Sequence, residues 1–313
     1  MSLHLIYWTF LKEVACFPDR RERYISLYYK PNKPFLRNYF RFWARIKVAE
    51  ILAKFDELYP PDLLDSLENL FPLEKTRKIC GDVLSQGSHE LGLEEDIDVY
   101  VMVGVYTSNA FTTFVAGRPM VGIGLEHFDH RPNKHPWSLG DKPENLPIWL
   151  YHEMAHAARW GQGSFSPLRK ALEEAGEFSW EAISRRIPLL EWLWSEGVAV
   201  AFSYYMTGSP LHNCLGFCEE KLAFCQENEE KLWQEFFKDK DRTDLEAYFK
   251  WFSGSELTFE RKIPPERAGY YLGFRAVESV ISRSEARWAE LSRLSFEKVL
   301  AGLNKVLSML VHM

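Results

Sequence analysis

The chain has 313 residues, of which 46% are hydrophobic and 26% are charged. These are the proportions of a globular protein, so they exclude a disordered chain and a collagen-like or mucin-like fibre. Lys and Arg number 38 against 44 Asp and Glu, which gives a net charge of −6. This mild excess of acid argues against nucleic acid and anionic membranes as partners.

The N-terminal sequence and the cysteines predict a cytoplasmic protein. The first eight residues lack a basic leader, so we expect no signal peptide. No window holds 18 uninterrupted apolar residues, which predicts that no helix crosses a membrane. The odd number of cysteines, five, indicates reduced thiols. Cys214, Cys218 and Cys225 are spaced by four and seven residues, so we expect them to be buried on one helix face.

The predicted elements change character along the chain. Residues 1–72 have the pattern of helices, with apolar residues at helical spacing between Phe35 and Tyr59. Pro60 and Pro61 end that stretch. Short segments rich in β-branched and aromatic residues then predict strands. These strands are expected at 97–105, 109–115 and 120–125. Further helices are expected at 62–70, 74–84, 146–160, 167–178, 189–206, 216–238, 242–252, 266–283 and 294–311.

This order of elements predicts a predominantly helical α+β fold with a small mixed sheet at about 97–125. We expect a helical N-terminal region over residues 1–72. Residues 73–313 would form one domain that contains the sheet, the helices 146–160 and 189–206, and the C-terminal helices. The sequence indicates no particular oligomeric state.

The motif His152-Glu153-x-x-His156 lies on the helix predicted over 146–160. Residues four apart project from one face of a helix, so both imidazoles could ligate one tetrahedral zinc ion. Glu153 would then lie beside the metal without binding it and take a proton from the attacking water. The alternative is that the two histidines make ordinary polar contacts beside the core.

Glu196 is the candidate third ligand. It is an acid within the otherwise apolar stretch 192–199, where a buried carboxylate needs a cation or a donor. Gly197 directly after it would let another backbone approach closely. Glu191 is a weaker candidate, because acids are favoured near a helix start in any case. The alternative for Glu196 is a surface position.

His152-Glu153-x-x-His156 followed by Glu196-Gly197-x-Ala199 resembles the gluzincin zinc peptidases. The finer pattern is similar to a family of predicted zinc-dependent proteases of unknown function. That similarity covers about residues 97–280 and includes Leu146-Pro147, Arg159, Glu196-Gly197 and Gly269-Tyr270-x-x-Gly273. It implies a zincin-like fold, a bound Zn²⁺ and a peptide or protein substrate.

The resemblance also implies roles for residues outside the motif. Asn109 and Ala110 would hold the substrate backbone on an edge strand, although Asn109 is equally explained as a turn residue. Tyr270, or else Tyr271, would stabilise the oxyanion, with plain packing as the alternative. Val200 stands where thermolysin-like enzymes have an acid, so another residue must orient the ligands.

The sequence therefore predicts a zinc metallopeptidase. The Gly-x-Met-Glu-Asn motif of aminopeptidase N relatives is absent, which favours cleavage within peptides. One alternative is a catalytically silent zinc-binding protein with a regulatory or partner-binding role on the same fold. Another is a metal-free helical scaffold in which the motif is accidental.

Overall fold

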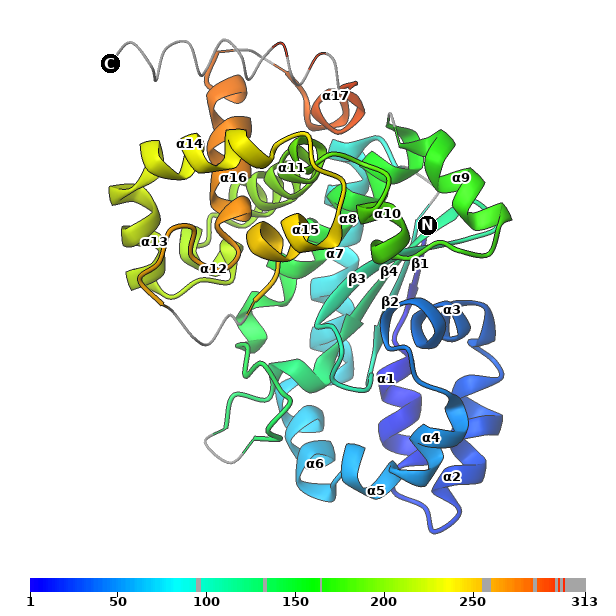
Figure 1. Cartoon of the computed structure of the whole chain (residues 1–313). Coiled ribbons are helices and arrows are strands. Elements are labelled where there is room, and N and C mark those ends of the chain that lie inside the picture. The colour runs from blue at the N-terminus through cyan, green and yellow to red at the C-terminus, as the bar shows by residue number, and fades with distance from the viewer. Residues whose placement is uncertain are drawn as a thin grey trace. The chain divides into compact units, whose positions relative to one another are not determined.

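Figure 1 shows a computed structural model of the chain. The structure describes residues 1–93, 97–131, 134–163, 165–254, 260–283, 286–295, 298 and 301. They divide into two units. The first contains Met1–His89 and Leu93–Ala157, and the second contains Glu90–Gly92 and the residues from Ala158 onward. The boundary expected at residue 72 does not coincide with this division.

The first unit contains a mixed four-stranded sheet with the order β1-β2-β4-β3. Its strands are β1 (Ser2–His4), β2 (Asp98–Met102), β3 (Ala110–Val115) and β4 (Arg118–Gly124). β1 pairs with β2 and β2 pairs with β4 in parallel, whereas β3 runs antiparallel to β4. The strands predicted near 97–125 are confirmed. β1 was not expected, because three residues show no periodicity and become a strand only by pairing with a segment almost 100 residues away.

Short helices make up most of the rest of the first unit. The helix expected over residues 35–59 is in fact broken into several segments. The helices between β1 and β2 are α1 (Ile6–Thr9), η1 (Phe10–Val14), α2 (Arg20–Arg23), η2 (Tyr24–Tyr29), α3 (Lys33–Asn38), η3 (Tyr39–Trp43), α4 (Val48–Ala53), α5 (Phe55–Leu58), α6 (Pro61–Leu70) and α7 (Leu73–Leu91). After the sheet come η4 (Leu125–Phe128), η5 (Pro143–Asn145) and α8 (Leu146–Gln162).

Opposite faces of the sheet contact different helices. The ring of Phe111 on β3 stacks with Phe35 of α3 and Tyr39 of η3, at centroid distances of 5.6 and 4.9 Å. Successive side chains on a strand point to opposite faces, and the next residue, Thr112, contacts Glu153 of α8. α3 and η3 therefore lie against one face of the sheet, and α8 lies against the other.

In the part of the second unit that the structure describes, every regular element is a helix. Its elements are α9 (Ser166–Glu174), α10 (Trp180–Ser184), α11 (Leu189–Thr207), α12 (Leu211–Leu215), α13 (Glu219–Glu227), α14 (Glu229–Asp239), α15 (Leu245–Phe252), α16 (Ala268–Ile281) and α17 (Trp288–Arg293). The helix predicted over 294–311 lies almost wholly outside the described residues. No helix among the described residues is long and apolar enough to cross a membrane.

The prediction of three cysteines on one helix face is wrong. Cys214 lies in α12, whereas Cys218 is the N-cap of α13 and Cys225 lies within it. Gly216 ends α12 in the left-handed conformation with φ of 64°, which glycine adopts at little cost. Cys214 and Cys225 are buried and Cys218 is exposed.

Candidate metal centre

The motif residues lie on α8, whose observed bounds of Leu146–Gln162 agree with the helix predicted over 146–160. Pro147 occupies its first turn, where a missing N–H costs nothing. His152, Glu153 and His156 are 4%, 8% and 9% exposed. The Nε2 atoms of the two histidines lie 3.2 Å apart, so both imidazoles point to the same place.

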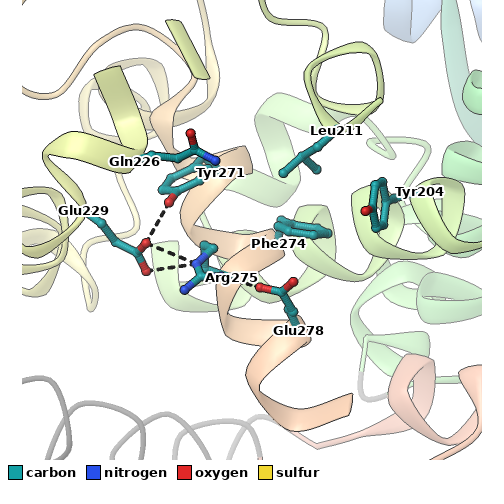
Figure 2. A pocket seen from close by; sticks show the side chains of 8 residues that line it. All are labelled: Tyr204, Leu211, Gln226, Glu229, Tyr271, Phe274, Arg275 and Glu278. Atoms are coloured by element: carbon teal, nitrogen blue, oxygen red, sulfur yellow. Dashed lines mark hydrogen bonds and ion pairs between the residues drawn. The ribbon is translucent and has the colours of Figure 1, made fainter. Parts of the chain in front are cut away.

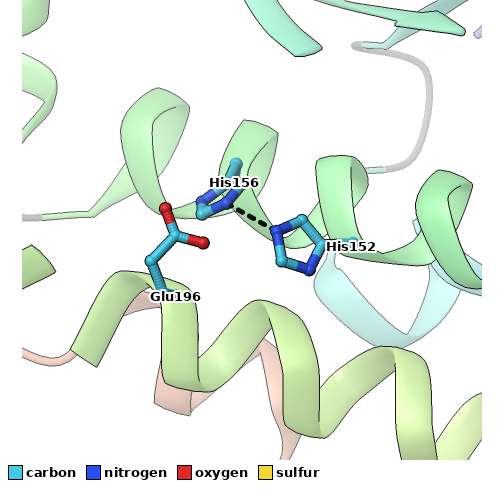
Figure 3. Close-up of side chains that lie close together, drawn as sticks. All are labelled: His152, His156 and Glu196. Carbon is cyan, nitrogen blue, oxygen red and sulfur yellow. Dashed lines mark hydrogen bonds between the residues drawn. The ribbon is translucent and has the colours of Figure 1, made fainter. Parts of the chain in front are cut away.

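Glu196 lies on α11, a helix in which every residue from Leu189 to Ser203 is buried. The ligand atoms of His152, His156 and Glu196 all lie within 4.8 Å of one another. Figure 3 shows the Glu196 carboxylate directed toward the two imidazoles. Glu196 is 5% exposed, so the expected alternative of a surface position is wrong. The three residues form a buried cluster that could hold a metal ion.

The geometry of this cluster fits zinc. Two imidazoles and one carboxylate are a common ligand set of catalytic zinc sites, which keep a fourth position open. Zinc–nitrogen bonds are about 2.0–2.1 Å long, so two nitrogen ligands at a tetrahedral angle lie about 3.3 Å apart. The observed 3.2 Å between the histidine Nε2 atoms agrees with that separation.

Glu191, the weaker candidate for the third ligand, has a different partner. Its Oε1 accepts hydrogen bonds from Nε of Arg159, at 2.9 Å, and from Nη2 of the same residue. Nη1 of Arg159 also donates to the carbonyl oxygens of Ser292 and Leu294, at 3.0 and 3.2 Å. Both charged side chains are about 1% exposed. Arg159 is part of the pattern that is similar to the predicted zinc-dependent proteases. Its guanidinium group is the cation that compensates the charge of Glu191.

Gly197 makes the close backbone approach that the sequence predicts. A Cβ atom at Gly197 would lie only 2.2 Å from the carbonyl oxygen of Gly273 on α16. A Cβ atom at Gly273 would lie 2.3 Å from the carbonyl oxygen of Leu193 on α11. The two glycines therefore let α11 and α16 cross in backbone contact. This contact fixes the part of α11 that carries Glu196 against the helix that begins with Ala268-Gly269-Tyr270.

Glu153 contacts a residue that the sequence did not single out. The hydroxyl of Thr112 on β3 lies 2.8 Å from Oε2 of Glu153 and 2.8 Å from its carbonyl oxygen. Thr112 is an ordinary strand residue by sequence, so no local signal distinguishes it. Only the packing of α8 against the sheet brings the two together.

Asn109 and Ala110 lie where β3 begins, and β3 is the last strand in the sheet order. The Ala110 N–H donates to Oδ1 of Asn109 at 2.9 Å, and the Ala110 carbonyl accepts from the Ser108 hydroxyl. The carbonyl of Asn109 accepts from the N–H of Gly124 on β4 at 2.9 Å. Both residues thus have local hydrogen bonds, and a substrate strand at Ala110 would have to exchange them.

The two candidate tyrosines of α16 have different surroundings. The hydroxyl of Tyr271 donates to Oε2 of Glu229 at 2.7 Å, and Tyr271 is 1% exposed. Tyr270 is partly exposed, with its ring 5.9 Å from Phe252 and 4.5 Å from the guanidinium carbon of Arg267. The Tyr271 hydroxyl is therefore engaged by α14, and Tyr270 keeps the more accessible ring.

A further tyrosine, Tyr248 on α15, is affected by the charge of the candidate ligand Glu196. Burial raises the pKa of Tyr248, and the negative charge of Glu196 raises it further. Its ring lies 5.0 Å from Trp192, which stands one helical turn before Glu196 on α11. No local sequence signal separates Tyr248 from the other tyrosines.

Glu126 and His127, between the sheet and α8, form a buried polar pair. His127 follows β4 in the loop segment before α8 and is only 2% exposed. Glu126 accepts hydrogen bonds from the N–H groups of Gly104 and Tyr106, at 2.6 and 3.2 Å. Burial raises the pKa of Glu126 to about 7 and lowers the pKa of His127 to about 4. Glu126 thus supports the backbone of the segment between β2 and β3.

A cavity of about 330 Å³ lies in the second unit (Figure 2). Its charged groups bond to one another, because Arg275 pairs with Glu229 through Nε, at 3.1 Å, and with Glu278 through Nη1. The metal-cluster residues do not line it. The lining residues are Tyr204, Leu211, Gln226, Glu229, Tyr271, Phe274, Arg275 and Glu278.

Comparison with known proteins finds one family. Residues 178–301 match the family described as predicted Zn-dependent protease (DUF2268). The matched segment is less than half of the chain and includes Glu196 and Tyr270, whereas His152, Glu153 and His156 precede it. No curated protein and no solved structure matches the chain. The comparison thus supports zinc dependence and proteolysis at the level of a family description.

Proposed function

We propose that this protein is a zinc-dependent peptidase. The observation that carries the proposal is the buried cluster of His152, His156 and Glu196, with Glu153 next to the first ligand on the same helix. The donor set and the 3.2 Å between the imidazole nitrogens suit one zinc ion. The family match of residues 178–301 supports the same activity.

In this proposal His152, His156 and Glu196 hold the ion, which when bound lowers the pKa of water and polarises a carbonyl. Glu153 takes the proton from the attacking water and then delivers it to the nitrogen of the leaving amine. Tyr270 donates a hydrogen bond to the oxyanion that develops on the substrate carbonyl. After one complete cycle Glu153 has returned the proton that it took, and Tyr270 has kept its own. Both side chains are then in their starting protonation states.

The substrate in this proposal is an extended segment of a peptide or protein. It would add to the outer edge of β3, with Asn109 and Ala110 at the start of that strand and main-chain hydrogen bonds supplying affinity. Such binding recognises the main chain of the substrate and not its terminus, which favours an endopeptidase. We place this activity in the cytoplasm, with neither nucleic acid nor a membrane as a partner.

Two measurements test the proposal. We expect the purified chain to contain about one zinc per molecule by elemental analysis, and Glu196→Gln to lower that content. We expect Glu153→Gln to keep the zinc and lower cleavage of a peptide library at least about 100-fold, the usual contribution of a general base. Glu177→Gln, which changes an exposed carboxylate, serves as the control.

The outcomes separate the alternatives. A chain that fails to take up zinc even after reconstitution would contradict the zinc centre. A chain that binds zinc but cleaves no peptide would support the regulatory alternative. Cleavage by Glu153→Gln at the wild-type rate would show that Glu153 is not the general base.

A further inference from the structure

Thr112 contacts Glu153 twice through a single hydroxyl. Its Oγ1 lies 2.8 Å from the main-chain carbonyl oxygen of Glu153 and 2.8 Å from the side-chain Oε2. A threonine hydroxyl has one proton, so it donates to these two oxygens as a shared or alternating bond. Because both contacts are to the same residue, they fix the direction of the Glu153 side chain relative to its own backbone.

The position of Thr112 is itself well defined. It is the third residue of β3, lies opposite Val121 of β4 and is 7% exposed. A residue in the middle of a paired strand has little backbone freedom, and a β-branched side chain has restricted rotamers. Thr112 is therefore a rigid support for a glutamate side chain that has three rotatable bonds of its own.

The main chain of Thr112 faces the outer edge of the sheet. The N–H of Gly124 donates to the carbonyl of Asn109, so these two residues form a hydrogen-bonded pair. Hydrogen-bonded and non-hydrogen-bonded pairs alternate along two antiparallel strands. Ala110, Thr112 and Phe114 therefore direct their N–H and C=O groups away from β4. In agreement, the Phe114 carbonyl accepts from Asn38 at 2.7 Å, and Asn109 and Ser108 bond to Ala110.

We propose that Thr112 is a positioning residue that holds the carboxylate of Glu153 in place from the strand that receives the substrate. This inference rests on the proposed function. The main chain of Thr112 would bind the substrate, and its side chain would hydrogen-bond to the general base, Glu153. Thr112 would therefore position both the substrate and the base. A catalytic group must be held within about 0.5 Å of its productive position to be effective.

The neighbouring Thr113 provides a matched control. It lies on the same strand, is 0% exposed, and its side chain points to the opposite face of the sheet. The Thr113 hydroxyl has no hydrogen-bond partner among the described residues. Thr113→Val thus makes the same chemical change as Thr112→Val in the same strand, without removing a contact to Glu153.

The test compares variants at position 112 by kcat, KM and zinc content with a peptide that the wild type cleaves. We expect Thr112→Val to lower kcat about 10-fold or more while KM and zinc content change less than about twofold. Thr112→Ser and Thr112→Ala differ only by the hydroxyl. We expect the serine variant to stay within about threefold of the wild-type kcat and the alanine variant to lose as much as valine does.

The result that overturns the inference is equal kcat for Thr112→Ser and Thr112→Ala. A rise in KM without a fall in kcat would also overturn it, as would a fall in kcat of the same size in Thr113→Val. A purely structural role for Thr112 gives those results. If Thr112→Val does not fold, the serine and alanine pair decides the question. Glu153→Gln separates the two proposals. An inactive Glu153→Gln beside a fully active Thr112→Ala refutes only the role of Thr112, whereas a fully active Glu153→Gln refutes the general-base role of Glu153 in the proposed function.

Discussion

Replacement of Gly197 by alanine tests whether the crossing of α11 and α16 supports the second unit. The new methyl group would lie 2.2 Å from the Gly273 carbonyl oxygen, 2.4 Å from its carbonyl carbon and 2.8 Å from its Cα atom. Ordinary contact begins near 3.4 Å. The helices must therefore move apart by about 1 Å, because backbone atoms cannot rotate away as a side chain can.

The expected cost combines two effects of opposite sign. Glycine to alanine inside a helix is normally favourable by about 0.5–1 kcal/mol. Forcing an extra carbon into a packed interior typically costs about 1–3 kcal/mol, and here the obstacle is backbone. Because the backbone cannot relax, we expect overpacking to prevail and Gly197→Ala to lower the free energy of unfolding by about 1–3 kcal/mol.

The control is Gly81→Ala on α7, where a Cβ atom would meet nothing within 4 Å. This variant gains the helical propensity without the clash, so we expect it to be more stable than the wild type by about 0.5–1 kcal/mol. Urea unfolding followed by circular dichroism measures both variants. If Gly197→Ala is as stable as Gly81→Ala, the backbone contact at this crossing does not have the role we assign to it.

Two further predictions concern buried charges. Arg159→Met leaves Glu191 buried without its cation, and we expect it to lower the free energy of unfolding by about 3–5 kcal/mol. Arg185→Met breaks an exposed pair with Glu181 and should cost less than about 1 kcal/mol; equal losses in urea unfolding would refute the distinction. Burial raises the pKa of Glu126 from 4.5 to about 7, so the folded chain holds this proton at a pH at which the unfolded chain releases it. That stabilisation is complete below pH 4.5 and is lost as the pH rises through 7, a change of about 3 kcal/mol. Glu126→Gln lacks this contribution, so we expect its free energy of unfolding to fall less between pH 5 and pH 8 than that of the wild type. Equal changes in the unfolding curves of the two proteins would contradict this prediction.

Local sequence patterns were enough to identify the motif helix, its chemistry and the strands after residue 97. His152 and His156 lie on one helix face because they are four residues apart, and this needs no tertiary information. The strands after residue 97 were evident because β-branched and aromatic residues favour strands locally. Glu196 was identifiable because a carboxylate inside an apolar helix requires a partner. Gly197 was identifiable because its missing side chain permits close approach.

Other features were decided only by tertiary structure. β1 exists because residues 2–4 find β2, and a three-residue strand has no signal of its own. Glu191 and Glu196 are both acids of one buried helix, and sequence could only rank them. The guanidinium of Arg159 assigns Glu191 to an ion pair. The contact of Thr112 with Glu153 joins residues 41 positions apart. Contacts between distant segments depend on which faces of the elements pack together, and local periodicity does not encode that choice.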